Sequence, residues 1–232
     1  MLPRIAPYPL PTGSELPANR ATWHLDPGRA VLLVHDMQNH FLAPFGTHDS
    51  PLPRVVENIA AIRKHCADLD VPVAFSAQPG GQSAAQRGLL RDFWGDGPPD
   101  DPHATAITDA LIPGLADARL TKWRYSAFVG TGLAGLLDAQ DQLIITGVYG
   151  HIGVLATALD AFMRDIQSFV VADAIADFSP EHHRDTLRHV AQRCGQVTTT
   201  RAVADGLLGM SCETPSVAAT RPRSRERKER IA

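Results

Sequence analysis

A carboxylate directly follows an apolar run near the start of the chain, in residues 34–41 (VHDMQNHF). The position of Asp36 alone leaves two interpretations about equally good. Aspartate is a favoured N-cap of a helix, and a carboxylate at the end of a buried strand can also serve as an acid or base towards a ligand.

Two further segments carry groups suited to an anion. Residues 120–128 (LTKWRYSAF) follow a stretch with a helical pattern and place Lys122 among aromatic and small side chains, although a lysine taken alone is more often a surface cation. Residues 145–153 (ITGVYGHIG) run from an apolar segment through a glycine-containing turn into a helical pattern. The N–H groups of a helix N-terminus favour an anion, but an ordinary strand-to-helix turn explains this pattern about as well.

Continuous apolar runs predict strands that are buried on both faces of a sheet. These runs are residues 30–35, 71–76, 142–146 and 168–172, and the β-branched run 196–200 predicts an outer strand. Helical spacing of apolar residues lies between the runs, at 55–69 and 152–163, and Ser179 followed by Pro180 predicts the start of another helix.

Strands that alternate with helices predict an α/β fold. We expect a three-layer, Rossmann-like arrangement, in which helices flank both faces of a mostly parallel sheet of about six strands. Ligands of such sheets bind beyond the carboxyl ends of the strands. Asp36, Gln78 and residues 147–154 should therefore meet at one edge of the sheet.

Changes in composition divide the chain into three regions. Residues 1–28 are rich in proline, which favours extended backbone, and predict an N-terminal arm. Residues 29–210 are long enough for one domain with a sizeable core. Residues 211–232 include a basic run without apolar periodicity and predict a disordered tail, solvated rather than bound to an acidic partner.

The overall composition is ordinary for a globular protein. Hydrophobic residues make up 44% of the 232 residues and charged residues 20%, and the net charge is −3. This balance, without an apolar stretch that could span a bilayer, predicts neither nucleic acid nor a membrane as a partner. The N-terminus lacks the apolar centre of a signal peptide, which predicts a cytoplasmic protein.

No metal or organic cofactor is expected. Cys66, Cys194 and Cys212 lack metal-ligand spacing, and their odd number argues against a disulfide framework. His35 and His151 also lack partners at such spacing, which favours hydrogen-bonded structural histidines.

Taken together, these segments resemble the isochorismatase family, which belongs to a larger set of cysteine hydrolases that includes nicotinamidases. The resemblance covers about residues 3–205. The motifs that carry it are LPANRATW at 16–23, LLVHDMQ at 32–38, SAQP at 76–79, QRGLLRDFWG at 86–95, TKWRYSAF at 121–128, GVYGHIG at 147–153 and VADAIADFS at 171–179. The domain at 29–210 is thus expected to be an isochorismatase-like hydrolase.

The wider family uses an Asp–Lys–Cys triad. Asp36 and Lys122 match the first two members, whereas the position of the cysteine falls on Val154. A valine cannot attack a carbonyl, which opposes a relative that cleaves amides through a thioester. The resemblance is closest to the branch that acts in phenazine and related antibiotic pathways, whose members also lack this cysteine.

The resemblance implies hydrolysis of the enol-pyruvyl (vinyl) ether of 2-amino-2-deoxyisochorismate, of isochorismate, or of both. The products are pyruvate and a dihydro-aromatic acid. A siderophore-pathway isochorismatase is the alternative. A non-catalytic binding protein that kept the pocket is a further alternative, against which the presence of Asp36, Lys122, Gln78 and Arg87 argues.

The resemblance also assigns roles to residues. Asp36 is expected to protonate the vinyl carbon, and Lys122 to pair mainly with a carboxylate or the ether oxygen of the substrate. Donation at neutral pH requires a raised pKa of Asp36, which burial would provide and Lys122 would oppose. The expected substrate-binding residues are Phe41, Gln78, Arg87, Trp94, Tyr149, Gly150 and Gly153.

Three further expectations come from the family. A non-proline cis peptide is implied near Tyr149–Gly150. Relatives are usually homodimers. The siderophore-type enzymes often carry an aryl carrier domain, which is not expected in this chain because the resemblance ends near Asp205.

Overall fold

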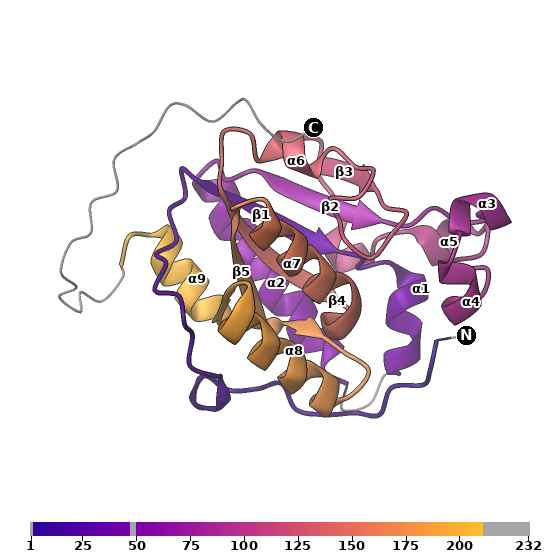
Figure 1. The fold of residues 1–232 in the computed structure, drawn as a ribbon, viewed down its shortest axis with the longest axis horizontal. Coiled ribbons are helices and arrows are strands. Elements are labelled where there is room, and N and C mark those ends of the chain that lie inside the picture. The colour runs from indigo at the N-terminus through magenta and orange to yellow at the C-terminus, as the bar shows by residue number, and fades with distance from the viewer. Residues whose placement is uncertain (1, 47–49, 211–232) are drawn as a thin grey trace.

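A computed structural model gives the arrangement of the chain and describes residues 2–46 and 50–210. Its centre is a six-stranded sheet in the order β3-β2-β1-β4-β5-β6 (Figure 1). All neighbouring strands are parallel. The strands are β1 Ala30–His35, β2 Val73–Ala77, β3 Ala118–Thr121, β4 Gln142–Val148, β5 Gln167–Ala176 and β6 Gln196–Thr198. The predicted α/β fold with a parallel sheet is confirmed.

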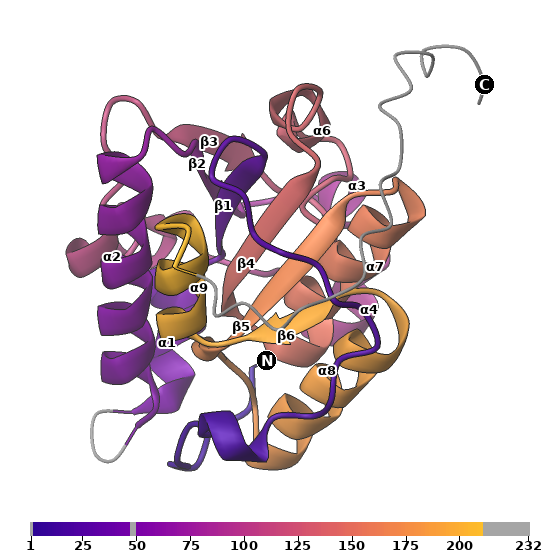
Figure 2. The ribbon, with the colours of Figure 1, turned by 90° about the vertical axis from the view of Figure 1, so that its left-hand side faces the viewer.

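Four longer helices cover the two faces of the sheet (Figure 2). Helices α2 (Leu52–Asp68) and α9 (Thr200–Leu207) lie on one face, and α7 (Leu155–Met163) and α8 (Pro180–Arg193) lie on the other. Successive residues of a strand point to opposite faces. The side chains of β1 therefore divide between two hydrophobic cores, one beneath α2 and one beneath α7 and α8.

Short elements fill the connections. They are α1 Asn39–Leu42, α3 Ala84–Arg87, α4 Leu90–Trp94, α5 Pro102–Thr105 and α6 Leu133–Leu136, the 3-10 turns Gly13–Glu15, Ala43–Phe45 and Asp109–Leu111, and a π-helical turn Gly150–Val154. The predicted helix start at Ser179 is confirmed, because its side chain accepts a hydrogen bond from the backbone N–H of His182.

Strand β3 was not expected from the sequence. Of its four residues only Leu120 is buried, because β3 lies at the edge of the sheet and no apolar run marks it. Lys122 therefore follows the end of a strand rather than a helical stretch. This places Lys122 at the same sheet edge as Asp36.

The strand order reverses between β1 and β4. From β1 the chain continues outward to β2 and β3, and from β4 it continues the other way to β5 and β6. Ligands of open α/β sheets bind beyond the carboxyl ends of the strands at such a point. Asp36 directly follows β1, and the turn Gly150–Val154 follows β4, so both predicted segments meet there.

The N-terminal arm runs along the outer strand β6. The side chain of Asn19 donates to the carbonyl of Val197 (2.8 Å) and accepts from its N–H (2.8 Å). The side chain of Gln196 makes two similar bonds to the backbone of Trp23 (2.9 and 3.1 Å). The arm thus takes the place of a further strand at this edge.

Two expectations concern other parts of the chain. The predicted tail at 211–232, with Cys212, lies outside the described residues. Across 2–46 and 50–210, no helix has the length and apolar character that crossing a bilayer requires.

Candidate active site

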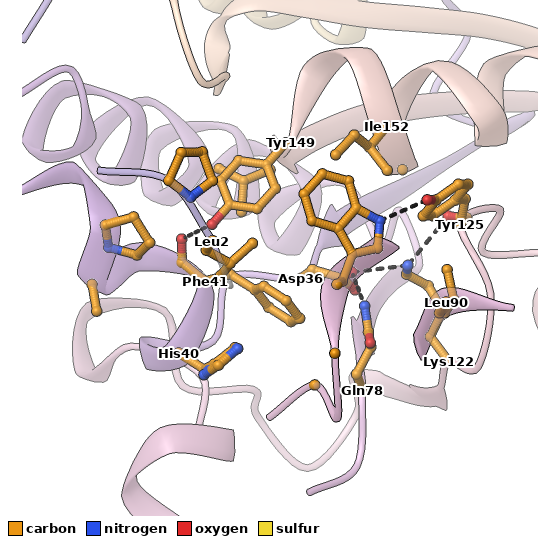
Figure 3. Close-up of a pocket in the computed structure, with 18 of the residues that line it drawn as sticks. Leu2, Asp36, His40, Phe41, Gln78, Leu90, Lys122, Tyr125, Tyr149 and Ile152 are labelled. Atoms are coloured by element: carbon orange, nitrogen blue, oxygen red, sulfur yellow. Dashed lines mark hydrogen bonds and ion pairs between the residues drawn. The ribbon is translucent and has the colours of Figure 1, made fainter. Parts of the chain in front are cut away.

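A pocket of about 700 Å³ opens at the carboxyl edge of the sheet (Figure 3). Each of the strands β1, β2, β3 and β4 contributes a residue to the pocket from its carboxyl end. Eight of the nine predicted site residues line the pocket: Asp36, Phe41, Gln78, Arg87, Trp94, Lys122, Tyr149 and Gly153. Residues far apart in the sequence therefore meet in one cavity.

Asp36 is buried at 4% exposure and faces polar groups of the pocket. Its Oδ1 accepts a hydrogen bond from the hydroxyl of Ser76 (2.6 Å), and its Oδ2 lies 2.9 Å from Nζ of Lys122. Its φ of 50° is in the left-handed region, which aspartate tolerates better than most residues. The N-cap of α1 is Gln38, so the helix-capping interpretation of Asp36 does not hold.

Lys122 is buried, which excludes the surface alternative. Besides Asp36, its ammonium donates to the carbonyl oxygens of Arg124 (2.8 Å) and Tyr125 (3.2 Å). An ammonium has three N–H donors, and all three are used. Pairing with a substrate therefore requires Lys122 to release one of these partners.

The pKa of Asp36 is lowered, not raised as the sequence suggested. Burial raises this pKa, but the charge of a protonated His35, the charge of Lys122 and the hydrogen bond from Ser76 lower it, and the lowering prevails. Burial also lowers the pKa of His35, so this ring is neutral at pH 7 and Lys122 is the cation that holds Asp36 ionised. We expected burial by aromatic side chains to dominate the pKa of Asp36, but the ion pair with Lys122 outweighs its effect.

Arg87 is a buried cation in the wall of the pocket. It is 4% exposed, which excludes the interpretation as a surface residue. Its Nε donates to the carbonyl of Gly95 (3.0 Å) and its Nη1 to Oε1 of Gln78 (2.9 Å). No carboxylate of the described residues forms an ion pair with it, and the remaining N–H groups are free to bind an anion.

The backbone near Arg87 is shaped around the guanidinium. Gly97 has a φ of 82°, and a Cβ there would lie 2.7 Å from Cζ of Arg87. The glycine therefore allows the loop to lie flat against the cation. A buried guanidinium without a counter-ion is costly, so this arrangement favours an anionic ligand.

The turn after β4 forms the opposite wall. The cis peptide lies at Val148–Tyr149, one bond before the expected position. The hydroxyl of Tyr149 donates to the carbonyl of Phe41 (2.5 Å), and Gly153 packs against the ring of His35. Gly150 is not among the lining residues, because its Cα faces the buried carboxylate of Asp177 behind the turn.

Both histidines that were predicted to be structural are hydrogen-bonded. His35 contacts the carbonyl of Val148 through Nδ1 (2.8 Å), and His151 contacts Oδ1 of Asp177 through Nδ1 (2.5 Å). In the described part of the chain, no cluster of three or more His, Cys, Asp or Glu side chains could hold a metal ion.

Comparison with known proteins gives the family. The isochorismatase domain model matches residues 30–202. The chain is 54% identical over 204 residues to the phenazine biosynthesis protein PhzD of Pseudomonas fluorescens, a match that covers 87% of this chain and 98% of PhzD. It is 47% identical over 208 residues to the isochorismatase of Bacillus subtilis, covering 89% of this chain and 67% of that protein.

The chain belongs to the isochorismatase family. Its fold is shared with a cysteine hydrolase of Pseudomonas syringae, which superposes with a TM-score of 0.74 at 24% identity over 83% of this chain and 98% of that one. As a member of this family, the protein is an isochorismatase-type hydrolase.

In this isochorismatase-family protein, the residue that the resemblance matches to the cysteine of the wider family is Val154. Val154 is fully buried in the hydrophobic core that includes residues of α7 and α8. Cys66 and Cys194 do not line the pocket, and burial raises their pKa to about 12 and about 11. Neither is poised as a thiolate nucleophile, which agrees with hydrolysis of an ether rather than an amide.

The sequence did not indicate Tyr125, which lines the pocket, or Ser76 and Gln38, which lie behind it and hold pocket residues in place. Ser76 holds Asp36, and Tyr125 accepts a hydrogen bond from Nε1 of Trp94 (2.7 Å). The side chain of Gln38 bonds to both the N–H and the carbonyl of Gln78 (2.7 and 2.8 Å) and so fixes its position. Ser76 and Gln38 lie beside strand ends, so the rule that found Asp36 could have found them.

Proposed function

We propose that the protein hydrolyses the enol-pyruvyl ether of 2-amino-2-deoxyisochorismate, of isochorismate or of both, with Asp36 as the acid. The observation that carries this proposal is the pairing of two groups in one pocket. A buried carboxyl that can move a proton lies beside Gln78, which in turn bonds to the buried cation Arg87. The substrate needs both, because it is an anion whose double bond must be protonated.

The proposed reaction uses no covalent intermediate with the protein. Asp36 donates its proton to the terminal methylene carbon of the vinyl ether, and an oxocarbenium ion forms. Water adds to this cation while the Asp36 carboxylate accepts a proton from the water. The resulting hemiketal collapses when its C–O bond to the ring breaks and its hydroxyl proton passes to the ring oxygen. Pyruvate and the ring alcohol leave.

Asp36 must gain its proton when the substrate binds, because the ion pair with Lys122 holds it ionised in the free protein. A bound anion adds negative charge beside Asp36, which raises its pKa. The aromatic side chains of Phe41, Trp94 and Tyr149 line the pocket, where they would exclude water from a bound ligand. The same negative charge gives Lys122 an alternative partner, as the sequence analysis expected.

The test is release of pyruvate, measured with a coupled lactate dehydrogenase assay. We expect the wild-type protein to release pyruvate from one or both substrates. Asp36→Asn should lower kcat by about 100-fold to 10,000-fold, since the amide cannot donate the proton. A native rate in Asp36→Asn would contradict the proposal, and no release by the wild-type protein would favour the non-catalytic alternative.

The finer choice of substrate and pathway is also a proposal. The high identity to PhzD supports the amino substrate and a phenazine-like antibiotic pathway. The identity of 45% to component B of the Escherichia coli enterobactin synthase keeps a siderophore pathway as the alternative. The ratio of kcat/KM for the two substrates distinguishes them.

We further propose a cytoplasmic homodimer that needs no cofactor. Exposed apolar side chains on neighbouring segments support a protein-facing surface, namely Val129 (44%), Phe162 (51%) and Met163 (74%). Free thiols at Cys66 and Cys194 support a reducing compartment. Light scattering on the purified protein tests the dimer.

A further inference from the structure

The N-terminal arm reaches the mouth of the pocket. Leu2, Pro3 and Arg4 line the cavity, although they precede the first strand by more than twenty residues. Figure 3 shows Leu2 beside Phe41 on the pocket wall. This part of the arm therefore forms part of the cavity that holds the substrate.

The arm is anchored directly after this contact, at Ile5 and Tyr8. Ile5 is 2% exposed, and its N–H donates to the carbonyl of Pro44 (2.9 Å). Further along, the hydroxyl of Tyr8 accepts from the N–H of Asp177 (2.7 Å) and contacts Nδ1 of His183 (3.2 Å). Arg4, which directly precedes the buried Ile5, is thereby kept at the pocket.

Two cations that line the pocket form no ion pair within the part of the chain that the structure describes. Lys122 pairs with Asp36 (2.9 Å), and the carboxylate of Asp96 pairs with Arg91 (3.1 Å). Arg87 interacts with the charge of Asp96 but forms no ion pair with a carboxylate of the described residues, and Arg4 has neither an ion pair nor a hydrogen bond from its side chain to any of them. Two positive charges therefore remain for a ligand.

We propose that Arg4 and Arg87 form two separate carboxylate subsites, so that the N-terminal arm takes part in substrate binding. This inference rests on the proposed function. The enol-pyruvyl substrate carries two carboxylates, one on the ring and one on the pyruvyl group. Arg87 binds one from within the pocket, and Arg4 binds the other at its mouth.

This arrangement distinguishes substrate from products. Hydrolysis divides the two carboxylates between two molecules, so neither product contacts both arginines. Loss of Arg4 should weaken binding of the intact substrate and of only one product. The product that is affected identifies the carboxylate that Arg4 holds.

The experiment compares Arg4→Gln, Arg4→Lys and the control Arg20→Gln by pyruvate release at low ionic strength. Arg20 lies on the same arm, is exposed and does not line the pocket. We expect Arg4→Gln to raise KM by about tenfold, because it removes one charge-assisted contact, and to change kcat little. Arg4→Lys should restore most of the affinity, and Arg20→Gln should match the wild type.

The outcomes separate this inference from the proposed function. If the wild-type protein releases pyruvate and Arg4→Gln has an unchanged KM, the Arg4 subsite is wrong. If the wild-type protein releases none, the proposed function fails, and calorimetric titration with isochorismate still tests Arg4. Weaker binding by Arg4→Gln than by Arg20→Gln would then support the subsite, and equal binding would overturn it.

Discussion

Asp36, the proposed proton donor, is ionised in the free protein and therefore carries no proton to donate. Asp36 accepts hydrogen bonds from Ser76 and Lys122, and each bond favours the carboxylate over the neutral form. The ion pair also satisfies two buried charges that would otherwise be unpaired. The site is therefore stable without substrate, and catalysis depends on a change of charge when the ligand enters.

Binding of a dianionic ligand should take up a proton. At pH 7 the lowered pKa keeps Asp36 ionised in the free protein, whereas the proposed reaction needs it neutral in the complex. We expect uptake of up to about one proton per site when a substrate analogue with a saturated ether binds. Titration calorimetry in buffers of different ionisation enthalpy measures this number.

Two variants test whether Asp36 is the residue that takes up the proton when the analogue binds. Asp36→Asn should abolish the uptake, whereas uptake by His40, which also lines the pocket, would persist in this variant. Lys122→Met should reduce the uptake, because loss of this cation raises the pKa of Asp36 in the free protein. A fraction of the free protein then already carries the proton before the analogue binds. Tight binding of the analogue without any uptake by the wild-type protein would contradict the mechanism.

Individual site residues were predictable to different degrees. Asp36 follows an apolar run, so the position of strand ends in a parallel sheet indicated its place. Arg87 and Lys122 resemble surface cations in the sequence and were assigned through the family. Their hydrogen-bond partners come from distant segments, so the lowered pKa of Asp36 could not be inferred from its neighbours in sequence.

At the scale of elements, strand ends and the turns after them position the site. The apolar runs predicted the central strands, because a strand buried on both faces must be apolar throughout. The edge strand β3 was not predicted, because only Leu120 is buried in it and no apolar run therefore marks it in the sequence. The turn after β4 was predicted as a glycine-containing connection, but its packing against His35 depends on the neighbouring strand β1.

The close packing of the turn after β4 predicts that adding one methyl group at Gly153 destabilises the fold. A Cβ at Gly153 would lie 2.2 Å from Cε1 of His35, whose ring is fully buried and contacts the carbonyl of Val148. We expect Gly153→Ala to destabilise the fold by about 1–3 kcal/mol, as overpacking of a core does. Activity should also fall, since Val148 and Tyr149 line the pocket.

Gly135→Ala is the matched control for this prediction. Gly135 lies in α6, and a Cβ there meets no atom within 4 Å. Urea denaturation should show a lower midpoint for Gly153→Ala and an unchanged or higher midpoint for Gly135→Ala. Equal midpoints for Gly153→Ala and the wild type would mean that His35 can move, against the packing described above.

At the scale of the whole molecule, the N-terminal arm joins two distant regions. Residues 2–4 lie at the pocket, Tyr8 contacts Asp177, and Asn19 to Trp23 lie along the outer strand β6. The proline content predicted that the arm is extended. Its path could not be predicted, because it is set by contacts with residues that lie far away in the sequence.

The arm also protects the edge of the sheet. A free edge strand presents backbone groups that can pair with another chain. Both backbone groups of Val197 are instead bonded to the side chain of Asn19 (2.8 Å each). Asn19→Ala removes both bonds and uncovers this edge, with no change to the pocket.

We expect Asn19→Ala to lower the free energy of unfolding by about 1–2 kcal/mol, the net value of two such hydrogen bonds. The melting temperature should fall by roughly 2–4 °C per kcal/mol in a domain of this size. Aggregation on heating should increase, because Val197 becomes available for pairing, while KM and kcat at 25 °C stay near wild type. Arg20→Ala on the same arm should do none of this, since no hydrogen bond of its side chain to β6 is lost. A normal melting temperature in Asn19→Ala would show that the arm does not stabilise the edge through this residue.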